Sequence, residues 1–98
     1  MMNLIVTITN RGCSEELMAA ARNAGAGGGT ILNARGTGTA EDAIYWGITL
    51  TPEKEVLLIV AKQEDVANIV RAIKSKPVFS ERGAGIVFTL NIADLPSN

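Results

Sequence analysis

The chain has 98 residues, the size of one ordinary domain, and its formal net charge of −1 excludes the basic excess that a nucleic-acid-binding surface needs. It contains no histidine and a single cysteine, Cys13, which excludes imidazole catalysis, histidine-based zinc sites and an internal disulfide. Hydrophobic residues make up 47% of the chain but aromatic residues only 4%, so the predicted core is aliphatic.

The first half of the chain predicts a strand, a helix and a second strand. Hydrophobic residues alternate along Asn3–Thr9, which is typical of a strand with one apolar face. A turn at Arg11–Cys13 leads to Ser14, a candidate helix cap followed by two glutamates that favour the helix N-terminus. Gly25 is a natural stop for this helix. After a glycine-rich stretch, Thr30–Arg35 predicts the second strand.

The second half repeats this pattern after a long connection. The segment from Thr39 to Pro52 shows no clean periodicity, so we expect a loop there. Glu55–Ala61 predicts a third strand, and apolar residues at helical spacing after Glu64 and Asp65 predict a second helix: Val66, Ile69, Val70 and Ile73. A short loop then leads into a fourth strand, Ile86–Ile92.

The order of these elements, β-α-β-β-α-β, predicts the α+β ferredoxin-like fold in one domain over residues 1–98. In this fold a four-stranded antiparallel sheet carries both helices on one face. The third strand is apolar at every position from Val56 to Ala61, so both of its faces need cover. We expect Ile5, Val87 and several threonines on the uncovered face, with other copies of the same chain covering it. The open alternative is that Leu57, Ile59 and Ala61, or their neighbours, are merely half-exposed.

Two glycine-containing segments are candidate anion sites. Arg35–Gly38 ends the second strand, and Arg82–Gly85 leads into the fourth. Glycines let backbone N–H groups converge on an anion, although each segment also suits a plain turn. Of the close carboxylate pairs, Glu15/Glu16 and Glu64/Asp65 are explained by their positions at helix N-termini, and no pair is taken as catalytic. The neighbouring aromatics Tyr45 and Trp46 suit either a partner contact or packing of the loop.

Together these segments resemble the nitrogen-regulatory P-II signalling proteins from Leu4 to about Ala93. The resemblance is carried by the order and spacing of four short pieces: Gly28–Ile31, Arg35–Gly38, Lys54 and Gly83–Phe88. It implies a regulatory protein, not an enzyme, that forms a homotrimer and binds ATP or ADP between subunits. The loop at about residues 39–52 would be an effector loop, shorter than is usual in the family. That loop would contact a target, such as a nitrogen-utilisation enzyme or a membrane transporter.

The resemblance also implies which residues would bind the nucleotide. Thr30 and Val60 would lie beside the base. The phosphates would lie beside a larger group: Gly36, Thr37, Gly38, Lys54, Arg82, Gly83, Ala84 and Gly85. No catalytic or metal-binding residue is predicted.

The sequence departs from the family where charge matters most. Ala84 and Ile86 replace the family's Asp and Lys, and Thr39 and Ala40 replace a basic residue and a Gln. We therefore expect weakened nucleotide binding, a doubtful Mg site and no 2-oxoglutarate sensing. A trimeric divalent-metal-tolerance protein of the same fold is the alternative. We expect a cytoplasmic protein without a signal peptide or membrane insertion, because the apolar runs are short.

Overall fold

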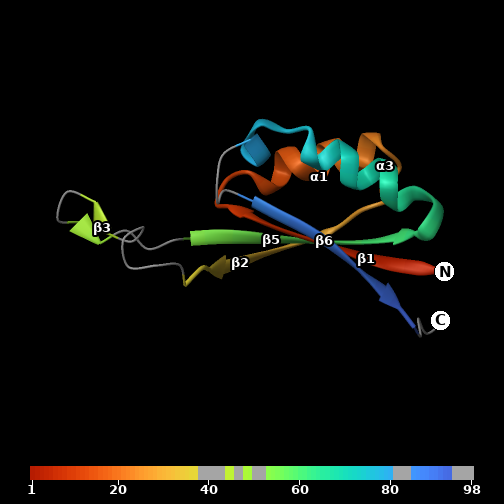
Figure 1. The fold of residues 1–98 in the computed structure, drawn as a ribbon, viewed down its shortest axis with the longest axis horizontal. Helices are drawn as coiled ribbons and strands as arrows, with labels where there is room; N and C mark the ends of the chain where they lie inside the picture. The colour runs from red at the N-terminus through yellow and green to blue at the C-terminus, as the bar shows by residue number, and fades with distance from the viewer. Residues whose placement is uncertain (38–43, 46–47, 50–52, 81–84, 94–98) are drawn as a thin grey trace.

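The computed structural model of the chain describes residues 1–37, 44–45, 48–49, 53–80 and 85–93 (Figure 1). Its elements follow one another as β1 (Met2–Asn10), α1 (Ser14–Asn23), β2 (Thr30–Arg35), β3 (Ile44–Tyr45), β4 (Ile48–Thr49), β5 (Glu53–Lys62), α3 (Gln63–Lys74), the 3-10 turn η1 (Pro77–Ser80) and β6 (Gly85–Ile92).

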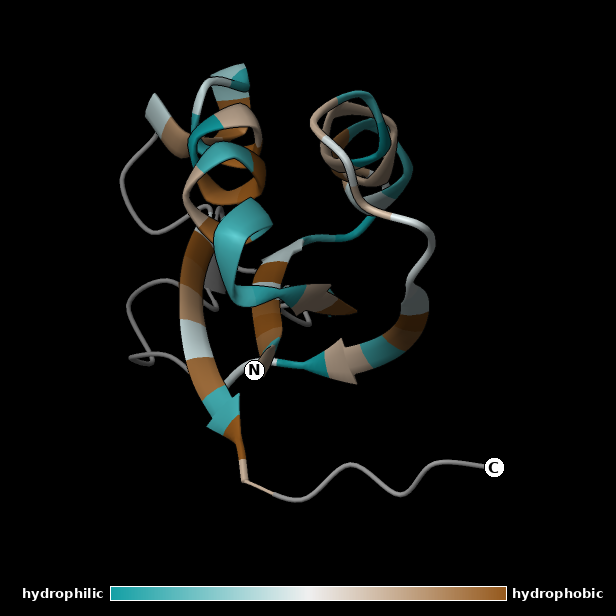
Figure 2. Ribbon diagram, turned by 90° about the vertical axis from the view of Figure 1, so that its right-hand side faces the viewer, coloured by the Kyte–Doolittle hydropathy of each residue, from teal (hydrophilic) through white to brown (hydrophobic). Residues whose placement is uncertain are grey.

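Four of the strands form one antiparallel sheet in the order β2-β5-β1-β6. Both helices lie on one face of this sheet, and among the described residues no helix covers the other face (Figures 1 and 2). This arrangement confirms the predicted α+β ferredoxin-like fold. It follows from the order of the elements, since each helix connects two strands that are not neighbours in the sheet.

The core lies between the helices and the sheet. Ile5 of β1 and its register partner Ile59 of β5 are both 0% exposed, and they pack against helix residues such as Leu17 and Ile69. The remaining core residues are aliphatic too, as the composition predicts: Met18, Ala21, Ala26, Leu57, Ala61 and Ile73.

The helix-free face of the sheet is here called the open face. It carries the side chains that alternate along each strand with those of the core. The prediction that Ile5 and Val87 lie on this face is wrong, because Ile5 is buried in the core and Val87 packs against it. The strand register instead places rows of apolar side chains on the open face. In each row a β1 residue lies between its partner on β5 and its partner on β6. The apolar rows of the open face consist of Leu4, Val6, Ile8, Leu32, Val56, Leu58, Val60, Ile86, Phe88 and Leu90.

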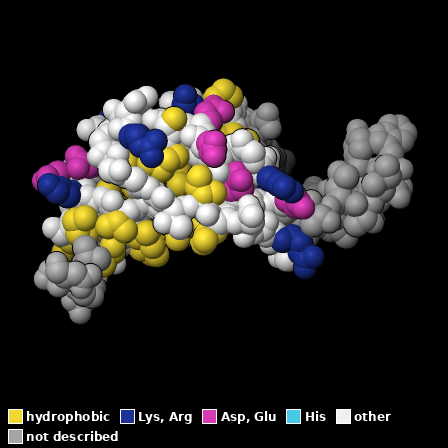
Figure 3. Space-filling model, turned by 180° about the vertical axis from the view of Figure 1, so that it is seen from behind, with side chains coloured by type: hydrophobic (Ala, Val, Ile, Leu, Met, Phe, Trp, Pro, Cys, Tyr) yellow, Lys and Arg dark blue, Asp and Glu magenta, His cyan; other side chains and the backbone are white. Residues whose placement is uncertain are grey.

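Much of the open face is accessible in a single chain. Ile86, Phe88 and Leu90 are 55%, 41% and 52% exposed, and Val60 on β5 is 46% exposed. Figure 3 shows hydrophobic side chains gathered along the side of the molecule away from the helices. A soluble monomer rarely exposes a contiguous apolar patch of this kind, so the open face is suited to an interface.

The connection between β2 and β5 contains a small hairpin where the sequence predicted only a loop. Ile44 pairs with Thr49 and Tyr45 with Ile48 in a two-stranded ladder. Figure 1 shows β3 beyond the end of β5, away from the four-stranded sheet. A ladder two residues long is too short to create a visible alternation, which is why the pattern missed it. Most of the predicted effector loop, and Trp46, lie outside the described residues.

The helix α1 ends as predicted, at a glycine. Gly25 has a φ of +116°, a conformation that costs glycine little and other residues more. Its N–H donates to the carbonyl of Arg22, and the next N–H, of Ala26, donates back to Ala21. These bonds satisfy carbonyls at the end of the helix and turn the chain toward β2.

Gly29 is required where β2 begins, because the chain there passes very close to its neighbours. A Cβ at this position would lie 2.8 Å from Met18 Sδ and 3.1 Å from both Leu57 Cδ1 and the carbonyl oxygen of Leu58. We therefore expect Gly29→Ala to lower the free energy of unfolding by about 1–3 kcal/mol. Urea denaturation would measure this, with Gly28→Ala as the control because nothing lies within 4 Å of a Cβ there. Equal stability of the two variants would contradict the prediction.

Candidate functional site

The strand ends that carry predicted site residues meet at one end of the four-stranded sheet. Antiparallel pairing places Asn10, the last residue of β1, opposite Lys54 near the start of β5. Arg35 ends β2 opposite Glu53, and Gly85 begins β6 opposite Thr9. The hairpin side of the molecule is therefore where the candidate loops gather (Figure 1).

The structure groups some of the predicted nucleotide-binding residues and separates others. Gly36 and Thr37 directly follow β2, so they lie at the same end of the sheet as Lys54 and Gly85. Four predicted residues lie outside the described residues: Gly38, Arg82, Gly83 and Ala84.

The two residues predicted to lie beside the base, Thr30 and Val60, are farther along the sheet. Thr30 pairs with Leu58, so it shares the open face with Val60. Val60 is six residues beyond Lys54 along β5, a separation of about 20 Å at the usual rise of a strand. Within one chain, the base-side and phosphate-side residues therefore form two separate groups.

Gly85 also has a structural reason to be glycine. A Cβ at this position would lie 3.0 Å from Cε1 of Phe79, whose ring packs over the start of β6. The glycine therefore admits the ring, whether or not its N–H also contacts a ligand.

The return from the hairpin to β5 is held by side chains that point to alternate faces. The guanidinium of Arg11 donates to the Glu53 carboxylate, which raises the pKa of Arg11 through that hydrogen bond and the negative charge. On the other side of the strand, Lys54 Nζ donates to Asn10 Oδ1 at 2.6 Å. Within the described ranges, Arg11 and Glu53 form the only ion pair, so neither Lys54 nor Arg35 is paired with a carboxylate there.

Glu55 serves as a cap for helix α1 from a distant part of the chain. Its Oε1 accepts hydrogen bonds from the hydroxyl and the N–H of Ser14, at 2.7 and 3.2 Å, and from the N–H of Gly12 at 2.9 Å. The predicted cap, Ser14, is instead the first helical residue, and the cap position is Cys13, without a side-chain bond. A carboxylate at a helix N-terminus is favoured by the helix dipole and by the unpaired N–H groups there.

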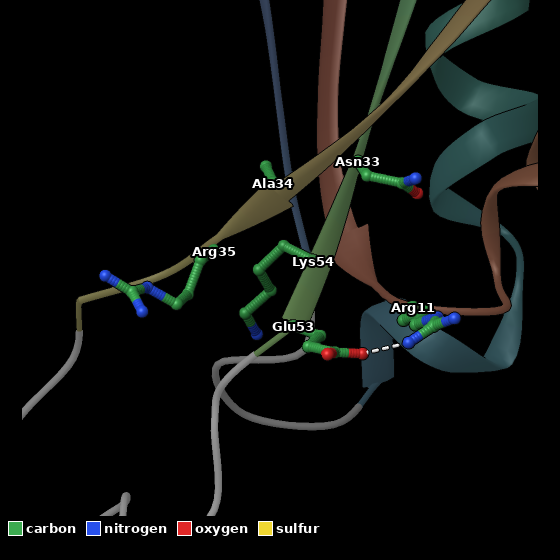
Figure 4. Close-up of a pocket in the computed structure, with 6 residues that line it drawn as sticks. All are labelled: Arg11, Asn33, Ala34, Arg35, Glu53 and Lys54. Carbon is green, nitrogen blue, oxygen red and sulfur yellow. Dashed lines mark hydrogen bonds and ion pairs between the residues drawn. The ribbon is translucent and has the colours of Figure 1, made fainter.

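A cavity of about 230 Å³ lies beside this junction, between the last residues of β2 and the first of β5. Its lining comprises Arg11, Asn33, Ala34, Arg35, Glu53 and Lys54 (Figure 4). The close-up shows Glu53 turned toward Arg11, whereas Lys54 extends away from this pair. Because cationic side chains outnumber carboxylates in this lining, the cavity favours a small anionic group.

Sequence reasoning missed Asn10, Arg11 and Glu55 as parts of this site. Each acts through a partner more than 40 positions away in the sequence, as the Lys54–Asn10 and Glu55–Ser14 bonds do. The register of β1 on β5 is needed to bring such partners together. The one available signal was the charge alternation Glu53-Lys54-Glu55, which on a strand implies opposite charges on opposite faces.

The pKa of Glu55 is lowered below its ordinary value, first by the hydrogen bond from the Ser14 hydroxyl and then by the N–H groups of Ser14 and Gly12. Partial burial acts in the opposite direction, and Arg11 adds a smaller lowering. A lowered folded-state pKa means that the ionised carboxylate stabilises the fold above about pH 4.5, and that this contribution is lost as the pH falls through the folded-state value.

We therefore expect Glu55→Gln to lower the free energy of unfolding at neutral pH by about 1–2 kcal/mol, because α1 loses a charged cap. The deficit relative to wild type should shrink as the pH is lowered from about 7 to about 3, since protonation weakens the wild-type cap as well. Urea denaturation across this range would measure it. Glu53→Gln is the matched control, because Glu53 contacts only an exposed guanidinium. A deficit that does not change with pH would contradict the assignment.

Among the described residues, no group of three or more His, Cys, Asp or Glu side chains could hold a metal ion. Neither helix in the described part of the chain is long and apolar enough to cross a membrane.

Comparison with known proteins gives a consistent result. Residues 2–96 match the family model of the nitrogen regulatory protein P-II. Among solved structures, the chain is similar to the crystal structure of a PII-like signaling protein from Thermus thermophilus. The two share a TM-score of 0.69 and 20% sequence identity, over 93% of this chain and 85% of that one, which shows a shared fold. No curated protein sequence matches the chain.

Proposed function

The chain belongs to the nitrogen regulatory protein P-II family, and on that premise we propose that it is a trimeric signalling protein that binds ATP or ADP between its subunits. Proteins of this family regulate other proteins rather than catalyse reactions. In this proposal the segment from about residue 39 to residue 52 contacts the target, which is a nitrogen-utilisation enzyme or a membrane transporter.

The observation that carries the proposal is the open face. Its apolar rows cross β2, β5, β1 and β6, and the charged residues that the described strands place on this face, Lys54 and Lys62, lie at its two ends. The exposed fractions of Phe88 and Leu90 leave these side chains in water in a single chain. Burying such a face stabilises an assembly by about 25 cal/mol for each Å² of apolar surface removed from water. Three copies with their open faces toward a common axis would bury it.

The separation of the two nucleotide-binding groups supports a site between subunits. Thr30 and Val60 lie on the open face, whereas Lys54 and Gly36 lie at the end of the sheet. If a neighbouring copy supplies the base-side residues, the two groups need not be close within one chain. The cationic junction of Lys54 and Arg35 would then lie beside the phosphates.

Binding would act on the target through the loop, since residues on both sides of that loop belong to the proposed site. Arg35 and Gly36 precede it, and Lys54 follows it. A ligand that binds one arrangement of the loop more tightly than another shifts the population toward it. Thr39 and Ala40, which replace a basic residue and a Gln of the family pattern, argue against 2-oxoglutarate and Mg as obligatory partners.

Isothermal titration calorimetry with ATP, ADP and AMP tests the nucleotide part of the proposal. We expect saturable binding of ATP or ADP to the wild type, and affinity at least about tenfold lower for Lys54→Met, which lacks a charge-assisted contact. Lys74→Met is the control, because Lys74 is an exposed lysine in the last turn of α3, on the helix side of the sheet. Absence of heat and of a thermal shift with all three nucleotides would show that the nucleotide part is wrong.

A further inference from the structure

The charges at the start of β5 are separated between the two faces of the strand. Glu53 and Glu55 are directed toward the turn between β1 and α1, where Arg11 and Ser14 occupy their carboxylates. Lys54, between them in sequence, is directed to the opposite face and is kept apart from both. The turn therefore removes the two carboxylates that flank Lys54 in the sequence as partners for its ammonium.

The partner that Lys54 does have is uncharged. Asn10 is its register partner across β1 and β5, and Asn10 Oδ1 accepts one hydrogen bond from Nζ at 2.6 Å. A lysine ammonium has three N–H donors, so two remain for a ligand. An amide oxygen restricts the position of the ammonium but leaves its full charge, which a carboxylate in the same place would neutralise.

We propose that Asn10 is the positioning residue of the anion site: it fixes the Lys54 ammonium at the end of the sheet with its charge intact, ready for a nucleotide phosphate group. This inference rests on the proposed function and names a residue that acts through Lys54. It also gives a reason for an uncharged side chain at position 10, because the register partner of this residue on β5 is the cation Lys54.

Two substitutions separate the two parts of the role of Asn10, which are to hold the ammonium in place and to leave its charge unneutralised. Asn10→Ala removes the acceptor, so the ammonium becomes mobile, and we expect the affinity for ATP or ADP to fall about three- to tenfold. Asn10→Asp keeps an acceptor of the same shape but pairs the ammonium with a carboxylate. We expect that variant to lose at least about tenfold in affinity although the ammonium stays ordered.

Asn68→Asp is the matched control, because it adds the same charge on the exposed surface of α3, outside the cavity and without a contact to Lys54. We expect its affinity to change less than about threefold, as for an exposed charge screened by salt. All three variants should unfold at nearly the wild-type temperature, because Asn10 is at the end of β1 and outside the core.

A second readout does not depend on nucleotide. The ¹⁵N-ammonium NMR signal of Lys54, assigned by its loss in Lys54→Met, should be sharp in the wild type and in Asn10→Asp but broadened in Asn10→Ala. An unchanged signal in Asn10→Ala would overturn the positioning role. If Asn10→Asp bound ATP or ADP with wild-type affinity, the proposal that residue 10 must be uncharged would be overturned.

If the wild type binds no nucleotide, the proposed function fails but the inference does not fall with it. The same variants are then titrated with inorganic pyrophosphate, observed through the Lys54 signal. Loss of the pyrophosphate response in Asn10→Asp, with the response kept in Asn68→Asp, would uphold the role of Asn10. Equal responses in the two variants, or no response in the wild type, would overturn it.

Discussion

Replacing Phe88 by Asp is expected to convert the proposed trimer into folded single chains. Phe88 is midway along the edge strand β6 on the open face, opposite Val6, and is 41% exposed before any assembly. In a single chain the new carboxylate would be in water at little cost. In an assembly it would be buried without a partner, and burial of an uncompensated charge opposes association strongly.

Analytical ultracentrifugation measures this result directly. We expect the wild type to sediment with three times the chain mass of 10.3 kDa and Phe88→Asp to sediment with the chain mass itself. Circular dichroism should show that the variant keeps its helices and strands. The nucleotide affinity of the variant should also be lost, because the proposed site is completed by a neighbouring copy. A wild type that sediments as a monomer at micromolar concentration would contradict both the trimer and the shared site.

The second large effect is expected in the core, at Ile5. Truncating a fully buried isoleucine leaves a cavity, so Ile5→Ala should lower the free energy of unfolding by about 2–5 kcal/mol. Its sequence neighbour Leu4 is half-buried on the open face, and Leu4→Ala should cost about 1 kcal/mol or less in a single chain.

Both substitutions are best measured by urea denaturation in the Phe88→Asp background, where assembly no longer contributes to stability. If the double variant Phe88→Asp/Ile5→Ala does not fold whereas Phe88→Asp/Leu4→Ala does, the result would also show that Ile5 is the core residue of the two. If Leu4→Ala proved the more damaging of the two, the assignment of the sheet faces would be incorrect.

The comparison of Ile5 with Leu4 also shows where sequence reasoning reaches its limit. The order and approximate bounds of the long elements could be predicted, because alternation along β1 and helical spacing along α3 are strong signals. The two faces of β1 could not be told apart, because both carry aliphatic residues. Thr7 and Thr9 gave the wrong indication: hydroxyl groups suggest exposure, yet both residues are 0% exposed on the helix side.

The candidate site was predictable only in part, for a different physical reason. The glycine-containing segments at the end of β2 and the start of β6 could be found from local turn chemistry, whereas Lys54 was indicated only by the resemblance to the P-II family. The roles of Asn10 and Glu55 could not, because they depend on pairing between β1 and β5, over 40 residues apart. Local patterns carry no information about such register.

The alternation of Glu53, Lys54 and Glu55 has a consequence for how this protein can change. A one-residue insertion or deletion next to Lys54 that shifted the start of β5 would exchange its faces. Two carboxylates would then face the ligand, and an ammonium would meet the positive end of α1. The segment between β2 and β5 can therefore change in length only if Glu53, Lys54 and Glu55 keep their pairing with β1. A chimera that exchanges this segment for that of another protein should leave this pairing unaltered.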